Sequence, residues 1–223
     1  MIPISDSEKS RRFPLFNIIF IVINSIVFVL QLASPDIEGF IYTYALVPSQ
    51  IDFSNLSTLY PFITSMFLHG GFLHIASNML FLWVFGDNVE GDLPIFVYPL
   101  LYLGSGIVGS LLQYFLSPTS TLPMLGASGA VAGALGAYFM FFPHHKIRTL
   151  VTIPPFITMI KVSAGFMLVY WIVLQIISGL GVLGETMGEQ GGVAYFAHIG
   201  GFVFGYLFAK ISPRRNPELQ RVE

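Results

Sequence analysis

Two polar side chains with complementary chemistry, Ser128 and His198, lie in a chain that is otherwise rich in apolar residues. A serine hydroxyl becomes a strong nucleophile when a neighbouring imidazole accepts its proton, which starts acyl transfer in serine hydrolases. The alternatives are a packing serine in the small-residue motif Gly126–Gly129 and a histidine that only joins two helices. The pair therefore predicts a Ser-His hydrolase if the fold brings both side chains together.

A second pair of polar residues, His74 and Asn78, is four positions apart and shares one face of a predicted helix. Both side chains can donate hydrogen bonds to the oxyanion that forms when a carbonyl is attacked. One such donor contributes roughly 3 kcal/mol to transition-state stability. The alternative is a structural polar pair. His69, which precedes this helix, is expected to tie the loop to the helix.

The composition predicts that these residues act inside a membrane. Of the 223 residues, 54% are hydrophobic and only 10% are charged, whereas soluble domains usually carry about 25% charged residues. Ten Lys and Arg against twelve Asp and Glu leave no basic surface for nucleic acid. The chain has no cysteine and no HExxH motif, which excludes a thiol nucleophile and this type of zinc protease. We therefore expect an integral membrane protein without metal or cofactor.

Six apolar segments approach the length of about 20 residues that crosses a bilayer as a helix. They cover residues 14–33, 71–86, 94–115, 128–142, 157–178 and 194–211. With a cytoplasmic N-terminus, all ten Lys and Arg residues fall on the cytoplasmic side, as the positive-inside rule requires. The sequence therefore predicts an all-α, polytopic bundle of six transmembrane helices.

One membrane domain is expected to account for most of the chain. It covers residues 14–211, between a cytoplasmic N-terminal tail at 1–13 and a cytoplasmic C-terminal tail at 212–223. The short tails and the lack of a transit peptide favour the plasma (inner) membrane of a prokaryote.

The six segments also restrict how a serine site could be built. None contains Asp or Glu, so a buried carboxylate for a Ser-His-Asp triad is lacking and a two-residue dyad remains. The segment that begins at Ser128 is too short to reach the outer surface, so Ser128 should lie below it, at a depth similar to that of His198. Small residues at every fourth position allow the two segments to approach closely. These residues are Gly129, Gly133, Ala137, Ala197, Gly201, Gly205 and Ala209.

Three motifs together carry a family resemblance. The motif Gly126–Gly129, the stretch Ala197–Gly201 and the spaced residues His69, His74 and Asn78 resemble the rhomboid family of intramembrane serine proteases. The resemblance extends from the second to the sixth predicted span, and it implies a six-helix rhomboid-like bundle.

The resemblance also implies a role for each matching residue. Ser128 would be the nucleophile and His198 the general base. His74, Asn78 and the backbone N–H of Ser128 would form the oxyanion site. The supporting residues would be His69, Gly126, Gly129 and Gly201.

The resemblance implies a class of substrate, and two alternative functions stay open. The implied partners are the lipid bilayer and single-pass membrane proteins, whose transmembrane segments would be cleaved where small residues and a nearby Gly or Pro allow the helix to unwind. One alternative is an inactive rhomboid-like protein that binds transmembrane helices without cleavage. Another is a small channel or transporter, against which the absence of charges within the spans argues.

Two positions depart from the family pattern. Tyr60 and Pro61 stand where many members carry a Trp-Arg pair, which leaves the packing of the first loop open. Ala132 stands where many members carry a tyrosine that supports the imidazole of the base. The sequence therefore does not explain what orients His198.

Overall fold

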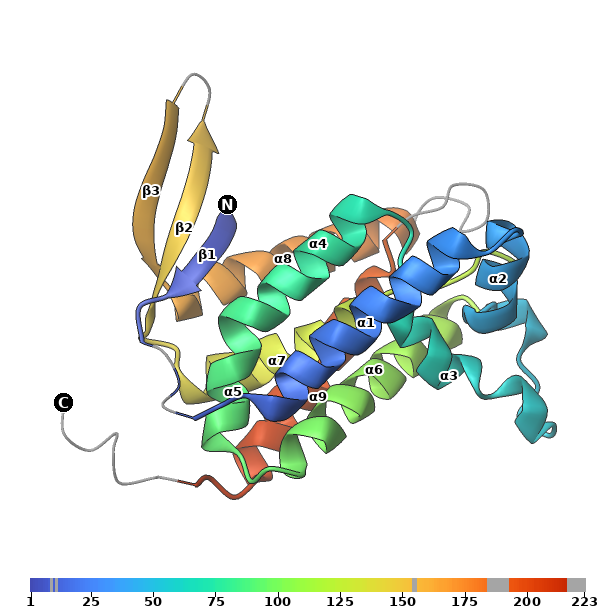
Figure 1. Cartoon of the computed structure of the whole chain (residues 1–223), viewed down its shortest axis with the longest axis horizontal. Coiled ribbons are helices and arrows are strands. Elements are labelled where there is room, and N and C mark those ends of the chain that lie inside the picture. The colour runs from blue at the N-terminus through green and yellow to red at the C-terminus, as the bar shows by residue number, and fades with distance from the viewer. Residues whose placement is uncertain (9, 11, 154–155, 184–192, 216–223) are drawn as a thin grey trace.

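The computed structural model describes residues 1–223 except 9, 11, 154–155, 184–192 and 216–223. Most of the predicted C-terminal tail (212–223) thus lies outside the described residues. The described chain is mostly helical, with long helices side by side and a small β-sheet at one end (Figure 1).

The elements follow one another along the chain. The helices are α1 (Leu15–Ala33), α2 (Ile37–Tyr44), α3 (Pro61–Thr64), α4 (Phe72–Phe81), α5 (Asp87–Asp92), α6 (Val97–Leu116), α7 (Ser128–Phe141), α8 (Ala164–Leu183) and α9 (Tyr195–Ile211). The strands are β1 (Ile2–Asp6), β2 (Lys146–Ile153) and β3 (Phe156–Ser163). A π-helical turn, Leu82–Gly86, links α4 to α5.

The long apolar helices make this chain an integral membrane protein. Helices α1 and α6 and residues Ala164–Gly181 of α8 are long and apolar enough to cross a bilayer. The bent pair Leu56–Phe67 and Phe72–Asp92 is a fourth candidate, and the apolar helices α7 and α9 are shorter. The count of six spans and the cytoplasmic side of both termini stay predictions.

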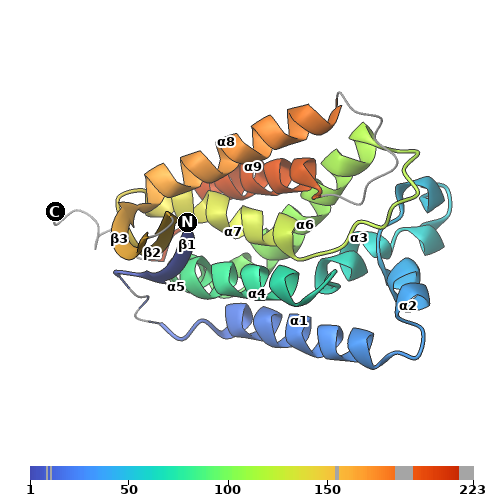
Figure 2. The same cartoon turned by 90° about the horizontal axis from the view of Figure 1, so that it is seen from above.

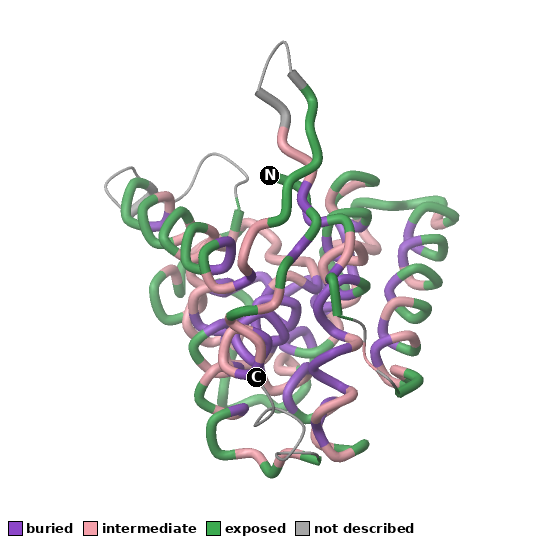
Figure 3. The backbone as a smooth tube through the Cα atoms, turned by 90° about the vertical axis from the view of Figure 1, so that its left-hand side faces the viewer, coloured by how far each residue is buried: buried purple, intermediate pink, exposed green. Residues whose placement is uncertain are grey.

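Buried residues gather in the centre of the bundle, whereas exposed residues follow its outer helices (Figure 3). Figure 2 shows α1 and α8 on opposite sides of the molecule, with α7 and α9 between them. The outward faces of α1 and α8 carry large exposed apolar side chains such as Val29, Leu30, Phe166 and Ile177. An apolar outer surface suits contact with lipid, so the polar residues of the site must find partners inside the bundle.

Helices α7 and α9 approach so closely that only glycine fits at their contact. A methyl group added at Gly201 would overlap the carbonyl oxygen of Gly129, and one added at Gly205 would overlap that of Gly133. Backbone therefore lies against backbone along the helices that carry Ser128 and His198.

The close contact predicts a marked effect of one methyl group. We expect Gly205→Ala to lower the free energy of unfolding by about 1–3 kcal/mol, because an overpacked contact must move the helices apart. Thermal unfolding of the purified protein in detergent measures the change. Gly181→Ala is the control, since nothing lies within 4 Å of a methyl group there. Equal stability of both variants would contradict the close contact.

The small sheet corrects the all-α prediction. It has the order β1-β2-β3 with both pairs antiparallel, and β2 pairs with β3 from Lys146↔Ser163 to Ile153↔Phe156. The predicted fifth span, 157–178, began too early, because residues 157–163 belong to β3 and α8 starts at Ala164. A short apolar run with β-branched residues is compatible with either a strand or a helix, so its hydrophobicity alone was misleading.

The sheet is joined to the bundle by a buried carboxylate. Asp6, in the segment predicted as a tail, accepts hydrogen bonds from Asn88 of α5 and Tyr138 of α7. The imidazole of His145 lies 3.3 Å from the same carboxylate. The N-terminal strand is thus held at the end of α7 that is remote from Ser128.

Candidate active site

Ser128 is the first residue of α7, and the loop before it is held in place by hydrogen bonds. The backbones of Met124 and Leu46 exchange two hydrogen bonds of 2.8 and 3.0 Å. The N–H of Gly126 donates to the carbonyl oxygen of Ser65 over 2.9 Å. These bonds fix the position at which α7 begins, and hence the position of the Ser128 hydroxyl.

Gly126 is required both by its backbone angle and by its neighbours. Its φ of +126° is unfavourable for residues with a side chain. A methyl group built there would lie 2.7 Å from Nε2 of His74 and 3.8 Å from Oγ of Ser128. The imidazole of His74 and the Ser128 hydroxyl therefore flank the same small space.

The structure brings Ser128 and His198 together from α7 and α9. The Oγ atom of Ser128 lies 2.7 Å from Nε2 of His198, which is a hydrogen-bond distance. His198 is buried, with 8% of its surface exposed. In this arrangement Nε2 can accept the hydroxyl proton.

The other nitrogen of the imidazole faces α8. Nδ1 of His198 lies 2.7 Å from Oε1 of Gln175. The ring of Trp171, one turn earlier on α8, lies with its centroid 5.8 Å from that of the imidazole. Sequence reasoning missed both residues. The available signal was the amide of Gln175 within an otherwise apolar span, because polar groups in spans are functional candidates.

His74 and Asn78 lie one turn apart on α4, and the imidazole of His74 lies beside Gly126. The N–H of Gly70 donates to Nδ1 of His74 over 3.3 Å, so in the neutral ring Nε2 carries the hydrogen. Asn78 is buried, and its Nδ2 has no hydrogen-bond partner among the residues described. Both side chains thus have an N–H group available for a further acceptor.

His69 is fully buried and is held by α1. Its N–H donates to Oε1 of Gln31, and its carbonyl oxygen accepts from Nε2 of Gln31. Its ring packs edge-on against the ring of His74, with centroids 5.2 Å apart. The position of His69 therefore depends on α1, and its ring supports that of His74.

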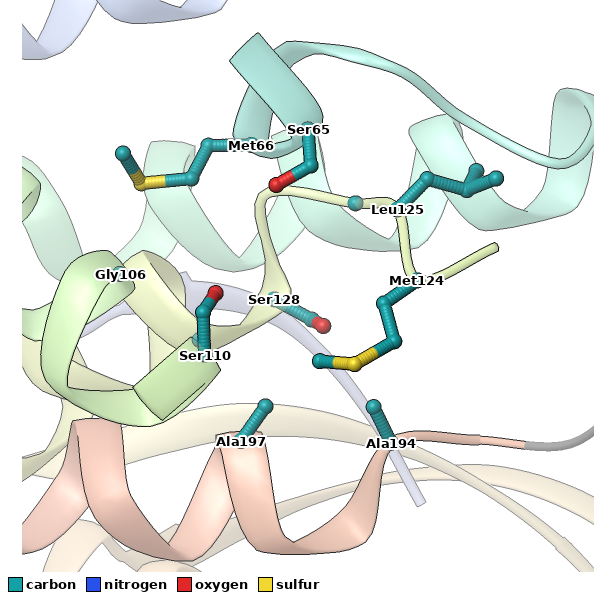
Figure 4. Close-up of a pocket in the computed structure, with 11 residues that line it drawn as sticks. Ser65, Met66, Gly106, Ser110, Met124, Leu125, Ser128, Ala194 and Ala197 are labelled. Atoms are coloured by element: carbon teal, nitrogen blue, oxygen red, sulfur yellow. The ribbon is translucent and has the colours of Figure 1, made fainter. Parts of the chain in front are cut away.

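A small, partly open hollow lies beside Ser128 (Figure 4). The Ser128 hydroxyl points into it, towards Met124 and the side of α9 that carries Ala194 and Ala197. Most of the lining residues are small. They are Ser65, Met66, Gly106, Ser110, Met124, Leu125, Gly126, Ser128, Gly129, Ala194 and Ala197. The hollow can therefore receive a small group next to the hydroxyl.

Within the described ranges, no cluster of three His, Cys, Asp or Glu side chains is placed to bind a metal ion. The polar groups around Ser128 are instead a hydroxyl, imidazoles and amides. These groups suit proton transfer and hydrogen bonding to an anion.

Comparisons with known proteins agree on one family. A sequence model described as the Rhomboid domain matches residues 56–215. Rhomboid protein 1, mitochondrial, of Saccharomyces cerevisiae is 32% identical over 178 residues, which are 78% of this chain and 46% of that protein. Rhomboid protease GluP of Bacillus subtilis is 37% identical over 107 residues, which are 47% of this chain and 20% of that protein.

A third relative is Presenilin-associated rhomboid-like protein A, mitochondrial, of Danio rerio. It is 33% identical over 147 residues, or 65% of this chain and 35% of that protein. The chain thus spans less than half the length of each of these relatives. Two of the three names indicate mitochondria, so the predicted prokaryotic membrane stays a prediction.

Proposed function

Because the chain belongs to the rhomboid family, we propose that it is an intramembrane serine endopeptidase that cleaves transmembrane segments of single-pass membrane proteins. Ser128 is the nucleophile and His198 the general base of a two-residue dyad. The 2.7 Å distance between Oγ of Ser128 and Nε2 of His198 carries this proposal. The similarity to Rhomboid protease GluP supports it.

In the proposed reaction, His198 accepts and returns the proton at each step. Nε2 of His198 accepts the hydroxyl proton while Oγ of Ser128 attacks the peptide carbonyl. When the tetrahedral intermediate collapses, His198 returns this proton to the leaving amine, and an acyl-enzyme remains. Water then attacks the ester, with His198 again acting as the base, and Ser128 is regenerated.

The charge that forms on the carbonyl oxygen needs donors near Oγ. Nε2 of His74 flanks the same space as the Ser128 hydroxyl, and Nδ2 of Asn78 is without a partner in the described chain. The N-terminus of α7 adds the backbone N–H of Ser128 and the favourable end of the helix dipole. We assign these three groups to the oxyanion site, with His69, Gly126, Gly129 and Gly201 supporting it.

The length of α7 supports a site that lies below the membrane surface. Its 14 residues span about 21 Å, which is less than the hydrocarbon thickness of about 30 Å. We propose that α7 and α9 complete a six-helix bundle, with the domain at 14–211 and both tails in the cytoplasm. The hollow beside Ser128 then supplies water from the outer side.

A direct test uses a serine-directed fluorophosphonate and a single-span reporter with the purified chain. We expect the phosphonate to label Ser128, as identified by mass spectrometry, and the reporter to be cut within its transmembrane segment. A reporter that binds and stays intact, together with an unlabelled Ser128, would instead indicate an inactive helix-binding protein.

The lining of the hollow predicts a preference for small residues at the cleavage site. We expect kcat/KM to fall about 10- to 100-fold when the residue before the cut changes from alanine to phenylalanine, because the ring does not fit among small side chains. The rates are measured on a reporter series cut at one bond. The same change one turn away from the cut is the control, and equal rates for alanine and phenylalanine would exclude this hollow as the binding site.

A further inference from the structure

The side-chain amide of Gln175 on α8 is held between two groups. Its Oε1 lies 2.7 Å from Nδ1 of His198. Its Nε2 donates to the carbonyl oxygen of Trp171, one turn earlier on the same helix, over 3.4 Å. The backbone of α8 therefore determines which end of the amide faces the imidazole.

The orientation of the amide determines where the imidazole carries its hydrogen. With Oε1 towards His198, Nδ1 must be the donor, and Nε2 is left as the acceptor for the Ser128 hydroxyl. A flipped amide would bring its oxygen against the carbonyl oxygen of Trp171. It would also present an N–H to Nδ1, and the imidazole hydrogen would move to Nε2, where it prevents proton transfer from Ser128.

We propose that Gln175 is the positioning residue of His198, and that it holds the imidazole in the tautomer and orientation that the dyad needs. The proposal rests on the proposed function of Ser128 and His198. It explains how a chain with Ala132 in place of a supporting tyrosine keeps its base oriented: the amide of Gln175 and the ring of Trp171 approach from α8 instead.

The contact also makes the dyad depend on α8. Gln175 and Trp171 lie on the face of α8 that packs against α9, and the opposite face carries exposed apolar side chains such as Val173 and Ile177. An outward displacement of α8 would remove the acceptor from Nδ1 while leaving Ser128 and His198 on α7 and α9. The base is therefore fully oriented only when α8 is packed in place.

Two substitutions separate hydrogen bonding from packing. Gln175→Leu keeps a side chain of similar bulk and removes the acceptor, so we expect kcat to fall about 10- to 100-fold, the loss typical of one hydrogen bond to a group that becomes charged. KM should change little, because the hollow beside Ser128 is untouched. Gln175→Glu keeps an oxygen acceptor for Nδ1 and should retain most of the activity.

The matched control is Gln113→Leu. Oε1 of Gln113 on α6 accepts a hydrogen bond from the N–H of Phe196, so it also connects a neighbouring helix to α9. In the described chain the imidazole of His198 is hydrogen-bonded to Gln175 and Ser128 and not to Gln113, so we expect the kcat of Gln113→Leu to equal that of the wild type. The wild type, Gln175→Leu, Gln175→Glu and Gln113→Leu are also treated with the fluorophosphonate. This reagent needs an oriented base, but no substrate helix has to enter the protein. Labelling of Ser128 in Gln175→Leu should slow by the same factor as kcat.

The pH profile gives a readout that a packing role would not change. The carboxylate of Gln175→Glu stabilises the protonated imidazole, which cannot act as a base, so the acidic limb of the profile should move to higher pH. Among the residues that the structure describes, His74 on α4 is the other titratable side chain that acts electrostatically on His198, and every variant keeps it. An acidic limb identical to that of the wild type would contradict contact between residue 175 and the imidazole.

Failure of this inference can be distinguished from failure of the proposed function. Wild-type kcat and labelling in Gln175→Leu, with Ser128→Ala inactive, would overturn the role of Gln175 and leave the dyad in place. Equal losses in Gln175→Leu and Gln175→Glu would also overturn it, because only the shape of the side chain would then matter. Full activity of Ser128→Ala would overturn the dyad, and the positioning role with it.

Discussion

Replacing either Ser128 or His198 with alanine is expected to lower the kcat for cleavage of a single-span reporter by about 10⁴-fold or more. The first change removes the nucleophile, and the second removes the acceptor that lies 2.7 Å from it. Cleavage is measured with purified protein in detergent and again in proteoliposomes, with folding checked by thermal unfolding.

The double variant tests whether the two residues act as one unit. We expect Ser128→Ala with His198→Ala to be no slower than either single variant, because a base without its nucleophile contributes nothing. Ser105→Ala is the control. Ser105 is a buried serine on α6 that donates to the carbonyl oxygen of Leu101, and the variant should cleave the reporter like the wild type. Substantial cleavage by either single variant would exclude the dyad.

Replacing Asn78 with alanine is expected to lower kcat by about 10²- to 10³-fold, the usual effect of removing one oxyanion donor. Its Nδ2 is buried and has no partner in the described part of the chain. The substitution therefore breaks no hydrogen bond of Nδ2 in the resting protein. KM should stay close to the wild-type value, because the donor acts mainly on the transition state.

Asn24 provides the matched control for Asn78. It is buried on α1, and its Nδ2 donates to the carbonyl oxygen of Phe20 and to the hydroxyl oxygen of Tyr102. Asn24→Ala should therefore lower the thermal stability while kcat stays at the wild-type value. Asn78→Ala should show the reverse pattern. An Asn78→Ala variant with an unchanged kcat and a lowered stability would make Asn78 a structural residue.

The membrane environment and the polar residues beside Ser128 could be predicted from the sequence. Composition alone shows this, because a chain with 10% charged residues has too few charged side chains to form the surface of a soluble protein. Glycine at every fourth position predicts close helix contact, and Gly201 and Gly205 do lie against the backbone of α7. Such features are local, because they depend on residue type and on spacing within one helix.

The sheet could not be predicted in the same way. Its strands come from residues 2–6, 146–153 and 156–163, and the first strand is far from the other two in the chain. An apolar run near the end of a span fits both a strand and a helix, and the pairing partner decides between them. The antiparallel register of β1 with β2 and the buried Asp6 carboxylate are therefore results of folding.

The sequence by itself determined the membrane setting and the polar residues available for chemistry, because both follow from residue type and short spacing. The tertiary structure alone decided that the imidazole of His198 is held by Gln175 of α8, with no tyrosine at position 132. Two side chains that are 23 positions apart meet only through the packing of α8 on α9. Hydrogen-bond partners between helices depend on helix rotation and depth, which no local pattern encodes.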